Sequence, residues 1–485
     1  MLYHSTRNKN HIADSAQAVL NGLAPDGGLY VPAVLPEVDV AACLQESTMD
    51  MAARIIGAML PDVPDMPELV RRAYTGKFQT QELTPTVDTG KFTVLELFRG
   101  PTSAFKDVAL CMLPQLLTRA KTVKGMQEDI LILTATSGDT GKAALAGFQD
   151  VDGVKICVFY PDGGVSKVQR AQMVTQEGSN VAVCAVTGNF DDAQTGVKNI
   201  FAAGVEGRLP DGNRCRLSTA NSINIGRLAP QITYYFKAYA DLLKRGQIAM
   251  GDEVNFSVPT GNFGDILAGY LAKKLGLPVG RLICASNANN VLTDFIRTGT
   301  YDRRRPLHKT ISPSMDILVS SNLERLLYLM SGDTELVAEL MGKLNTQGSY
   351  TVPEELKNAI GEEFWAGCCD DAGAGETIRK VWQEQNYLCD THTATGWAVA
   401  EQYVAESGDT RPMVVLSTAS PYKVPAAVLS ALEETTQTDE FRQMERLEQL
   451  TGVPIPENLR GLEQKKERHT GVIEKDEMLR YVMEI

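Results

Sequence analysis

Lys106 lies where a lysine amine could do covalent chemistry. It follows Ala104-Phe105 and precedes Asp107 and the apolar run Val108-Ala-Leu-Cys-Met112, so it is expected at the start of an apolar helix. Partial burial there would lower the pKa of the amine, which is the condition for forming a Schiff base with a carbonyl group. A lone lysine is far more often a solvated surface residue. The local sequence therefore leaves both interpretations of Lys106 open.

Two loops between an apolar run and a helix could bind an anion. Pro259-Thr-Gly-Asn-Phe-Gly-Asp265 has glycines that let backbone N–H groups approach an anion at a helix N-terminus. Asn221-Ser-Ile-Asn-Ile-Gly-Arg227 collects amides, a hydroxyl and a guanidinium, groups that suit a phosphate or a carboxylate. The alternatives are a tight turn that needs glycine for its backbone, and an ordinary helix cap at Ser222 or Asn224.

Ser137-Gly-Asp-Thr-Gly-Lys142 has the glycines of a nucleotide-binding P-loop but not its spacing. Only two residues separate Gly138 from Gly141, and Ala143 follows the lysine where Ser or Thr is needed. The chain also contains no G-x-G-x-x-G, H-E-x-x-H or G-x-S-x-G motif. The five histidines are dispersed, so no metal site is expected.

The elements that must position these residues follow one recurring pattern. Apolar runs beginning at Ile130, Lys155, Val181, Val254 and Pro412 each end in a polar or Gly-rich turn, and most lead into a helix. Fully apolar strands that alternate with helices predict α/β architecture with mostly parallel sheets covered on both faces. Ligands bind such sheets at the carboxyl ends of the strands, which is where the polar turns lie.

The two ends of the chain differ from this pattern. The first 90 or so residues are expected to form a separate small domain, with helices at 15–23, 51–60 and 66–77 around the turn-rich Pro25-Asp-Gly-Gly-Leu-Tyr-Val-Pro32. The last 50 or so residues are charged and are expected to include an exposed helix at 433–450 and a surface-covering tail.

Composition indicates a globular protein of the cytoplasm. The chain has 485 residues, 44% of them hydrophobic, and a formal net charge of -13. Without a basic stripe, nucleic acid is not an expected partner. No apolar run is long enough to span a membrane, no signal peptide is expected, and the nine scattered cysteines are expected to be buried and reduced.

Segments along nearly the whole chain resemble the threonine synthases, which belong to the fold type II pyridoxal-phosphate enzymes. The matching segments, in the order of the family, are Tyr3-His-Ser-Thr-Arg7, Gly22-Leu-Ala-Pro-Asp-Gly-Gly-Leu-Tyr-Val-Pro32, Glu96-Leu-Phe-Arg-Gly-Pro-Thr-Ser-Ala-Phe-Lys-Asp107, Thr136-Ser-Gly-Asp-Thr-Gly141, Asn221 to Arg227, Gly261 to Asp265, Asp390-Thr-His-Thr-Ala-Thr-Gly396 and Ser417-Thr-Ala-Ser-Pro-Tyr-Lys423. The chain departs from the family pattern at Thr391 and Ser420, where the family has Pro and often His.

The resemblance implies an α/β fold similar to that of the tryptophan synthase β subunit. Two open, mostly parallel sheets flanked by helices are expected, together with a small N-terminal domain. The implied division is 1–90 for the N-terminal domain, 91–125 and 250–485 for a large pyridoxal-phosphate-binding domain, and 126–249 for a small α/β domain.

The resemblance also implies residue roles. Lys106 would form the Schiff base with pyridoxal 5'-phosphate and then transfer protons. The other residues implied to hold the cofactor are Asp139 near its 3′-oxygen, Thr418 at its ring nitrogen, and the phosphate-wrapping Gly261, Asn262, Phe263, Gly264 and Asp265. The residues implied to hold the substrate are Thr140, Asn221, Ser222 and Arg227 at its phosphate and Ser137 at its carboxylate.

The implied activity is conversion of O-phospho-L-homoserine and water to L-threonine and phosphate by β,γ-elimination and replacement, the last step of threonine biosynthesis. A monomer or weak homodimer is expected. The alternatives are a serine/threonine dehydratase, a phospholyase acting on a related phosphoamino acid, and a non-catalytic sensor. Arg227 and Asn221 favour a phosphorylated substrate, and Lys106 disfavours a sensor.

Overall fold

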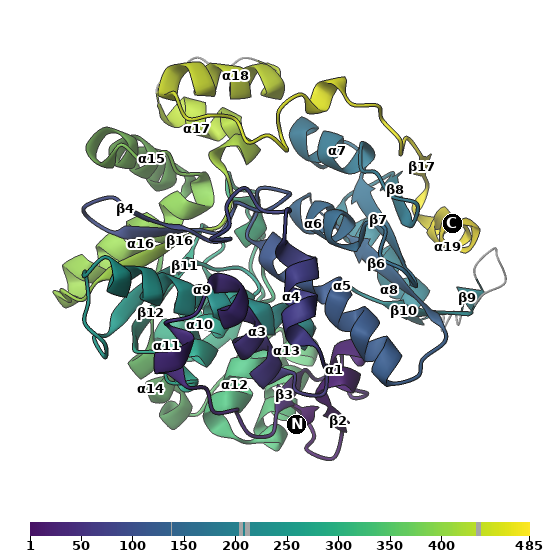
Figure 1. Ribbon diagram of the computed structural model, residues 1–485, viewed down its shortest axis with the longest axis horizontal. Helices are drawn as coiled ribbons and strands as arrows, with labels where there is room; N and C mark the ends of the chain where they lie inside the picture. Colours follow the sequence, from purple (N-terminus) through teal and green to yellow (C-terminus); the bar gives the residue numbers. More distant parts are fainter. Residues whose placement is uncertain (137, 203–206, 209–213, 433–437) are drawn as a thin grey trace.

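The computed structural model spans residues 1–485, of which residues 1–136, 138–202, 207–208, 214–432 and 438–485 are described below. Two six-stranded sheets organise the molecule. They lie side by side, with β11, β12 and β16 in one and β6, β7 and β8 in the other (Figure 1).

The first of these sheets has the strand order β15-β12-β11-β16-β5-β4, in which only β4 is antiparallel to its neighbour. Every residue of β11 is buried, so both faces of the sheet are covered, as its apolar sequence predicts. Helices α10 and α16 pack against β11 and β12. The strands are β4 (Thr86–Asp88), β5 (Thr93–Glu96), β11 (Val254–Pro259), β12 (Val279–Ser286), β15 (Phe364–Cys368) and β16 (Met413–Ser417). The helices of this region are α9 (Ile225–Lys244), α10 (Gly264–Lys274), α11 (Val291–Thr298), α12 (Leu323–Ser331), α13 (Thr334–Gln347), α14 (Glu354–Glu363), α15 (Asp371–Gln385), α16 (Thr391–Ser407), α17 (Pro425–Ala431) and α18 (Glu440–Thr451). The strands β13 (Thr300–Asp302) and β14 (Ser349–Thr351) pair with each other in a separate two-stranded antiparallel sheet.

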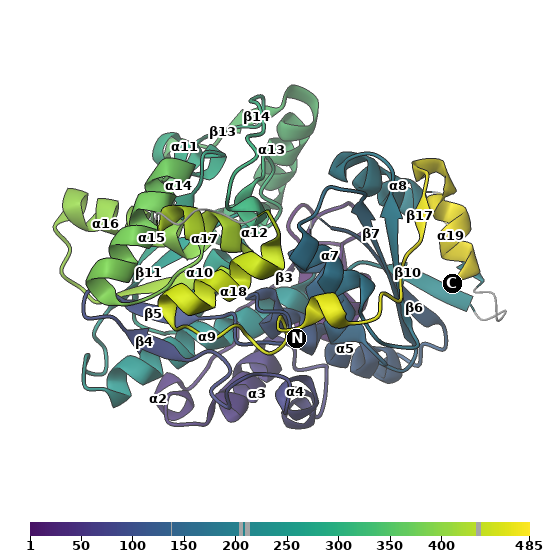
Figure 2. The ribbon, with the colours of Figure 1, turned by 90° about the horizontal axis from the view of Figure 1, so that it is seen from above.

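The second sheet has the order β17-β8-β7-β6-β10-β9, and only β9 is antiparallel to its neighbour. Its edge strand β17 comes from the C-terminal tail, and α19 of the same tail packs against α8 (Figures 1 and 2). The strands are β6 (Asp129–Ala135), β7 (Val154–Pro161), β8 (Val181–Val186), β9 (Gly207–Arg208), β10 (Arg214–Ser218) and β17 (Val472–Ile473). The helices are α6 (Asp139–Phe148), α7 (Lys167–Val174), α8 (Phe190–Ala202) and α19 (Met478–Glu484).

The N-terminal region combines helices with a three-stranded antiparallel sheet of order β2-β1-β3. The sequence pattern predicts the helices but not this sheet, because strands of three or four residues are too short to show a period. Helices α2, α3 and α4 lie along one edge of the molecule (Figure 2). The elements are β1 (Leu2–Ser5), β2 (Ile12–Asp14), β3 (Tyr30–Pro32), α1 (Ser15–Asn21), α2 (Val40–Cys43), α3 (Thr48–Met59) and α4 (Met66–Tyr74).

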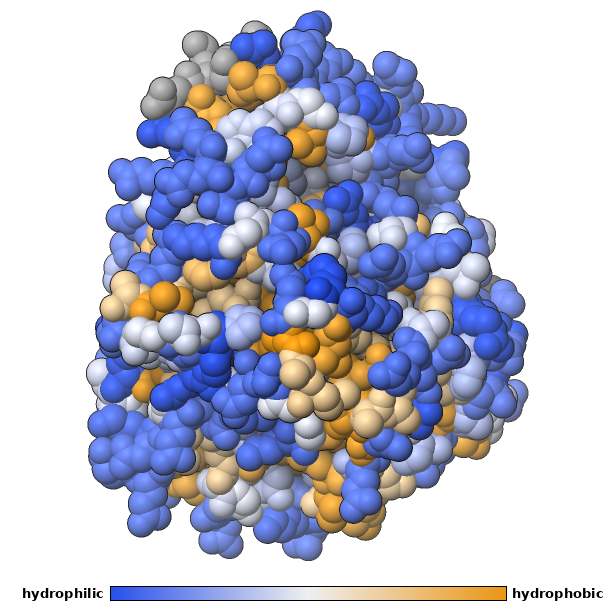
Figure 3. Space-filling view, turned by 60° about the vertical axis from the view of Figure 1, so that its left-hand side comes forward, coloured by the Kyte–Doolittle hydropathy of each residue, from blue (hydrophilic) through white to orange (hydrophobic). Residues whose placement is uncertain are grey.

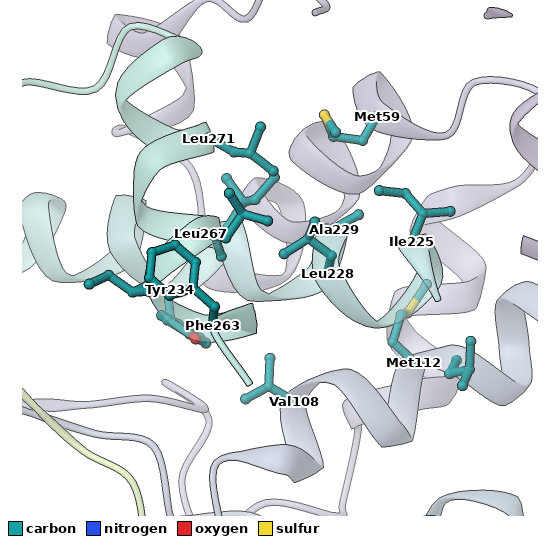
Figure 4. Packing of buried hydrophobic residues seen from close by; sticks show 14 of the residues in the cluster. Met59, Val108, Met112, Ile225, Leu228, Ala229, Tyr234, Phe263, Leu267 and Leu271 are labelled. Carbon is teal, nitrogen blue, oxygen red and sulfur yellow. The ribbon is translucent and has the colours of Figure 1, made fainter. Parts of the chain in front are cut away.

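One hydrophobic core joins the N-terminal region to helices α9 and α10. Met59 of α3, Met112 of α5 (Lys106–Val123), Leu228 of α9 and Leu267 of α10 all contribute buried side chains (Figure 4). Burying one such side chain is worth about 1.5–3 kcal/mol. This packing fixes α5, and therefore the place where Lys106 begins it.

The predicted α/β class, with two mostly parallel sheets and an N-terminal unit, is confirmed. The domain boundaries remain a prediction. Hydrophilic side chains dominate the face shown in Figure 3, and hydrophobic side chains come to the surface in a band across it. Within the described ranges, none of the helices combines the length and the apolar character needed to cross a membrane.

Candidate active site

Lys106 is placed by backbone contacts with the loop that follows β16. An isolated bridge pairs Ala104 with Ala419, and the Phe105 N–H donates to the Thr418 carbonyl oxygen over 2.8 Å. The Lys106 Nζ lies 4.8 Å from the centre of the Phe105 ring and 3.5 Å from the Ser314 Oγ. The amine therefore lies beside the carboxyl end of β16, the position that mostly parallel sheets offer to ligands.

The surroundings of Lys106 lower the pKa of its amine. Burial has the largest effect and lowers the pKa of Lys106 below its ordinary value. The charge of Asp139 opposes this effect, whereas the cations Arg227 and Lys423 add to it. A lysine with a lowered pKa has more of the unprotonated amine that attacks carbonyl groups. The desolvation expected from the sequence is thus present in the structure.

The turn between β11 and α10 presents backbone rather than side chains. A Cβ atom at Gly261 would lie 2.8 Å from the Ser314 carbonyl oxygen, so the site has no room for one. Phe263 adopts a left-handed φ of 65° at the N-cap of α10 and is buried in the core beside Tyr234 (Figure 4). Burial raises the pKa of Asp265 to about 7. Backbone N–H groups at a helix N-terminus suit a phosphate.

Arg227 is a buried cation with an unused donor. It lies in the first turn of α9, where it is 4% exposed and its Nη1 donates to the Ala220 carbonyl oxygen over 2.8 Å. Its Nε has no hydrogen-bond partner among the described residues, and burial lowers its pKa to about 10. An unsatisfied buried donor on a charged group is costly. Such a group is retained where an anionic ligand completes it.

Asp139 and Lys423 form an ion pair that connects the loops of the two sheets. Asp139 begins α6, and its Oδ1 lies 2.9 Å from the Lys423 Nζ and 3.1 Å from the Gln169 Nε2. Burial by itself would raise the pKa of Asp139, but the charges of Lys423 and Lys106 hold it well below its ordinary range. Lys423 also donates to Gln172 and to the Thr102 carbonyl oxygen. Asp139 is therefore a fixed carboxylate near Lys106.

The other residues predicted from the sequence are distributed around this centre. Asn322 joins two of them, since its Nδ2 donates to the Ser222 carbonyl oxygen over 3.2 Å and its backbone N–H donates to the Asn262 carbonyl oxygen over 3.0 Å. Asn221 is exposed at the start of the same loop, and Thr140 is half-buried in the first turn of α6. Ser137 lies outside the described residues.

Three contributors were not identified as site residues in the sequence. Lys423 and His392 lie within segments that resemble the family, but no role was attached to either. Ser314 gave no signal, because its segment has neither a motif nor a strand to locate it. The structure places its backbone N–H 3.2 Å from the His392 Nε2 and its hydroxyl against Lys106.

Together these groups can bind a carbonyl compound that also carries phosphate. Lys106 supplies the amine, the N-terminus of α10 supplies backbone donors, and Arg227 supplies a guanidinium. The N-terminus of α10 and the unpaired Nε of Arg227 each offer donors to an anionic group.

Comparisons with known proteins agree along the length of the chain. Residues 2–74 match the profile described as "Threonine synthase N terminus", residues 76–346 match "Pyridoxal-phosphate dependent enzyme", and residues 393–482 match "Threonine synthase, C-terminal". Threonine synthase of Pseudomonas aeruginosa is 41% identical over 440 residues, which cover 89% of this chain and 90% of that protein. The Saccharomyces cerevisiae enzyme is 37% identical over 466 residues, covering 89% of each. The crystal structure of threonine synthase from Brucella melitensis with bound pyridoxal phosphate superposes with a TM-score of 0.87 at 38% identity, covering 100% of this chain and 99% of that one.

Proposed function

The chain belongs to the threonine synthase family, and from that premise we propose that its site converts O-phospho-L-homoserine and water into L-threonine and phosphate. The reaction is the last step of threonine biosynthesis. The observation that carries the choice of substrate is Arg227, a buried guanidinium whose Nε has no partner among the described residues. A phosphate group on the substrate would satisfy it bidentately.

The residues present fit pyridoxal phosphate as the cofactor. Lys106 would hold its aldehyde carbon, the turn from Gly261 to Asp265 its phosphate, and Thr418 its ring nitrogen. Asp139 is available for the oxygen on the ring. Gly261 supports this fit, since its close approach to Ser314 leaves only backbone at that point. When bound, pyridoxal phosphate withdraws electrons from the substrate carbons that lose protons.

The protein's own contribution is proton transfer, anion binding and exclusion of water. When its amine is free, Lys106 would remove the proton from Cα and transfer the protons that leave Cβ and return to Cγ and Cα. Arg227 holds the phosphate as it leaves Cγ, with Thr140, Asn221 and Ser222 proposed as further donors and Ser137 proposed for the carboxylate. Asp139 is buried and Lys106 is half-buried, which limits the entry of water until it adds at Cβ.

Arg227 also separates this function from its alternatives. A dehydratase acting on serine or threonine has no phosphate to place beside Arg227. A phospholyase would use Arg227 but would release phosphate without forming threonine. A non-catalytic sensor would not need the amine of Lys106 beside Asp139 and Arg227.

The direct test of Lys106 is its replacement by alanine. We expect Lys106→Ala to lose the visible absorbance of the lysine-bound cofactor and to lower turnover at least about 1,000-fold. Lys142→Met is the matched control, because burial also lowers the pKa of Lys142, to about 7, but its amine contacts Gln176. The control should keep both properties. If Lys106→Ala kept absorbance and turnover, Lys106 would not be the catalytic lysine.

We further propose that the protein works in the cytoplasm as a monomer or weak homodimer, without nucleic-acid or membrane partners. The formal net charge of -13 supports the absence of nucleic acid.

A further inference from the structure

A buried chain of hydrogen bonds runs from Asp390 through His392 to Ser314. The Asp390 Oδ2 lies 2.6 Å from the His392 Nδ1, and the Ser314 backbone N–H donates to the His392 Nε2 over 3.2 Å. Asp390 is 0% exposed and His392 is 3% exposed. These contacts hold together α16, where His392 lies, and the short turn Pro313–Met315.

The direction of these hydrogen bonds fixes the state of the imidazole. A backbone N–H can only donate, so the His392 Nε2 must accept and the His392 Nδ1 must carry the proton toward Asp390. Asp390 is itself held as the N-cap of α16, because its side chain accepts from the backbone N–H groups of His392 and Thr393. His392 is therefore a neutral side chain in one tautomer and one orientation.

Ser314 lies between the amine and the proposed phosphate turn. Its hydroxyl oxygen is 3.5 Å from the Lys106 Nζ, and its carbonyl oxygen approaches the Gly261 backbone so closely that a Cβ there would lie 2.8 Å away. A displacement of this turn would therefore change both the partner of Lys106 and the wall of the phosphate site.

We propose that Ser314 is a positioning residue for the free amine of Lys106, and that Asp390 and His392 act by holding Ser314 in place. The proposal rests on the proposed function, in which Lys106 must be free when it removes the Cα proton. The amine that takes this proton becomes an ammonium with three donors, and the Ser314 hydroxyl accepts one of them. A flexible four-carbon side chain is then kept within reach of the substrate between proton transfers.

Kinetics of three single variants and one double variant test the positioning. We expect Ser314→Ala to lower kcat about 10- to 100-fold while the KM for O-phospho-L-homoserine stays within about twofold. His392→Leu should lower kcat by a similar factor. The side-chain oxygen of His392→Gln can still accept from the Ser314 N–H. The logarithm of its loss in kcat should therefore be at most half that of His392→Leu. The loss added by His392→Leu in the Ser314→Ala background should be smaller than the loss that His392→Leu causes alone, since both changes weaken the placement of the Ser314 hydroxyl beside Lys106.

A measurement on the cofactor-free enzyme tests the contact without relying on turnover. The rate at which an amine-reactive acylating reagent labels Lys106 is followed by mass spectrometry, with Lys142 as the internal control. Loss of the Ser314 hydroxyl should increase labelling of Lys106 severalfold and leave Lys142 unchanged, because one acceptor of the ammonium is gone.

The two measurements separate the possible failures. Unchanged kcat and unchanged labelling of Lys106 in Ser314→Ala would overturn the positioning role, and so would independent, multiplicative losses in the double variant. A wild-type enzyme that forms no threonine would contradict the proposed function, while the labelling comparison would still decide whether Ser314 contacts Lys106. Ser314→Ala removes a single half-buried hydroxyl, so it keeps the test valid if His392→Leu does not fold.

Discussion

Two buried arginines show how differently the same side chain is used in this protein. Arg325 is 1% exposed and donates to three acceptors from separate segments, namely the Tyr30 carbonyl oxygen, the Ile223 carbonyl oxygen and the Asn322 Oδ1. Arg227 is 4% exposed and donates to the Ala220 carbonyl oxygen, and its Nε has no partner among the described residues. Burial lowers the pKa of both to about 10.

The difference in hydrogen-bond partners separates a structural arginine, Arg325, from one with a proposed function, Arg227. Arg325 has its acceptors in place without any ligand, and it ties the N-terminal sheet at Tyr30 to the loop at Ile223. Through Asn322 it also reaches the turn that contains Asn262. The Nε of Arg227 has no such acceptor among the described residues, so burying this charge destabilises the folded protein unless an anion binds to it. Arg325 therefore braces the loops at Tyr30, Ile223 and Asn322, whereas Arg227 is proposed to act on the substrate.

Replacing Arg227 with methionine should produce the largest functional loss of the comparison. We expect Arg227→Met to lower kcat/KM for O-phospho-L-homoserine about 1,000-fold, equivalent to about 4 kcal/mol, because the leaving phosphate loses its buried guanidinium. The free energy of unfolding should stay within about 1 kcal/mol, since a costly buried charge leaves with the hydrogen bond. Steady-state kinetics and denaturant unfolding of the same variant measure the two effects. A stability loss without a catalytic loss would make Arg227 a structural residue.

Replacing Arg325 with methionine should give the opposite profile. Arg325→Met removes the donor from three oxygen acceptors, two of them on buried residues, so we expect the free energy of unfolding to fall by about 3 kcal/mol. Below the melting transition, kcat/KM should fall less than about tenfold, because Arg325 acts only through the loops it holds. Arg227→Met is the control for this variant, because both replace a buried arginine with methionine. If Arg325→Met left stability unchanged, the bracing role would be wrong.

A smaller loss is expected from the outer part of the same brace. Arg7 makes two hydrogen bonds of 2.8 Å to the Glu324 carboxylate, and its side chain is 23% exposed. We expect Arg7→Met to lower the free energy of unfolding by about 1 to 2 kcal/mol, discounted for this exposure. Denaturant unfolding in low and high salt measures it, and the difference from wild type should shrink in high salt. If Arg7→Met lowered the free energy of unfolding as much as Arg325→Met, the contacts of Glu324 would stabilise this region as much as those of Arg325.

The contrast also marks what the sequence could predict. Arg227 was identified because its partners in the proposed phosphate site, Asn221 and Ser222, lie within seven residues of sequence. Arg325 could not be identified in this way, because its acceptors lie as far as 295 residues away, at Tyr30. The parallel strands were predictable from apolar runs such as Val254–Pro259, in which every residue is buried.

Other features depend on tertiary contacts that carry no local pattern. Strand β17 has only two residues, and it forms because Val472 and Ile473 pair with Ala185 and Val186. Ser314 becomes part of the site only because His392 and Gly261 meet it from other elements. Sequence reasoning therefore predicts the strands and loops that contain their own signal, and it misses groups that are assembled from distant segments.

The most direct test of the central claim is to follow both products from O-phospho-L-homoserine with the holoenzyme. Phosphate release and L-threonine formation are measured in parallel samples over the same time course. The proposed function predicts that both appear at the same rate, one threonine for each phosphate, and that both disappear in Lys106→Ala. Phosphate without threonine would contradict the proposed function and indicate a phospholyase, and the absence of both products would show that this compound is not the substrate.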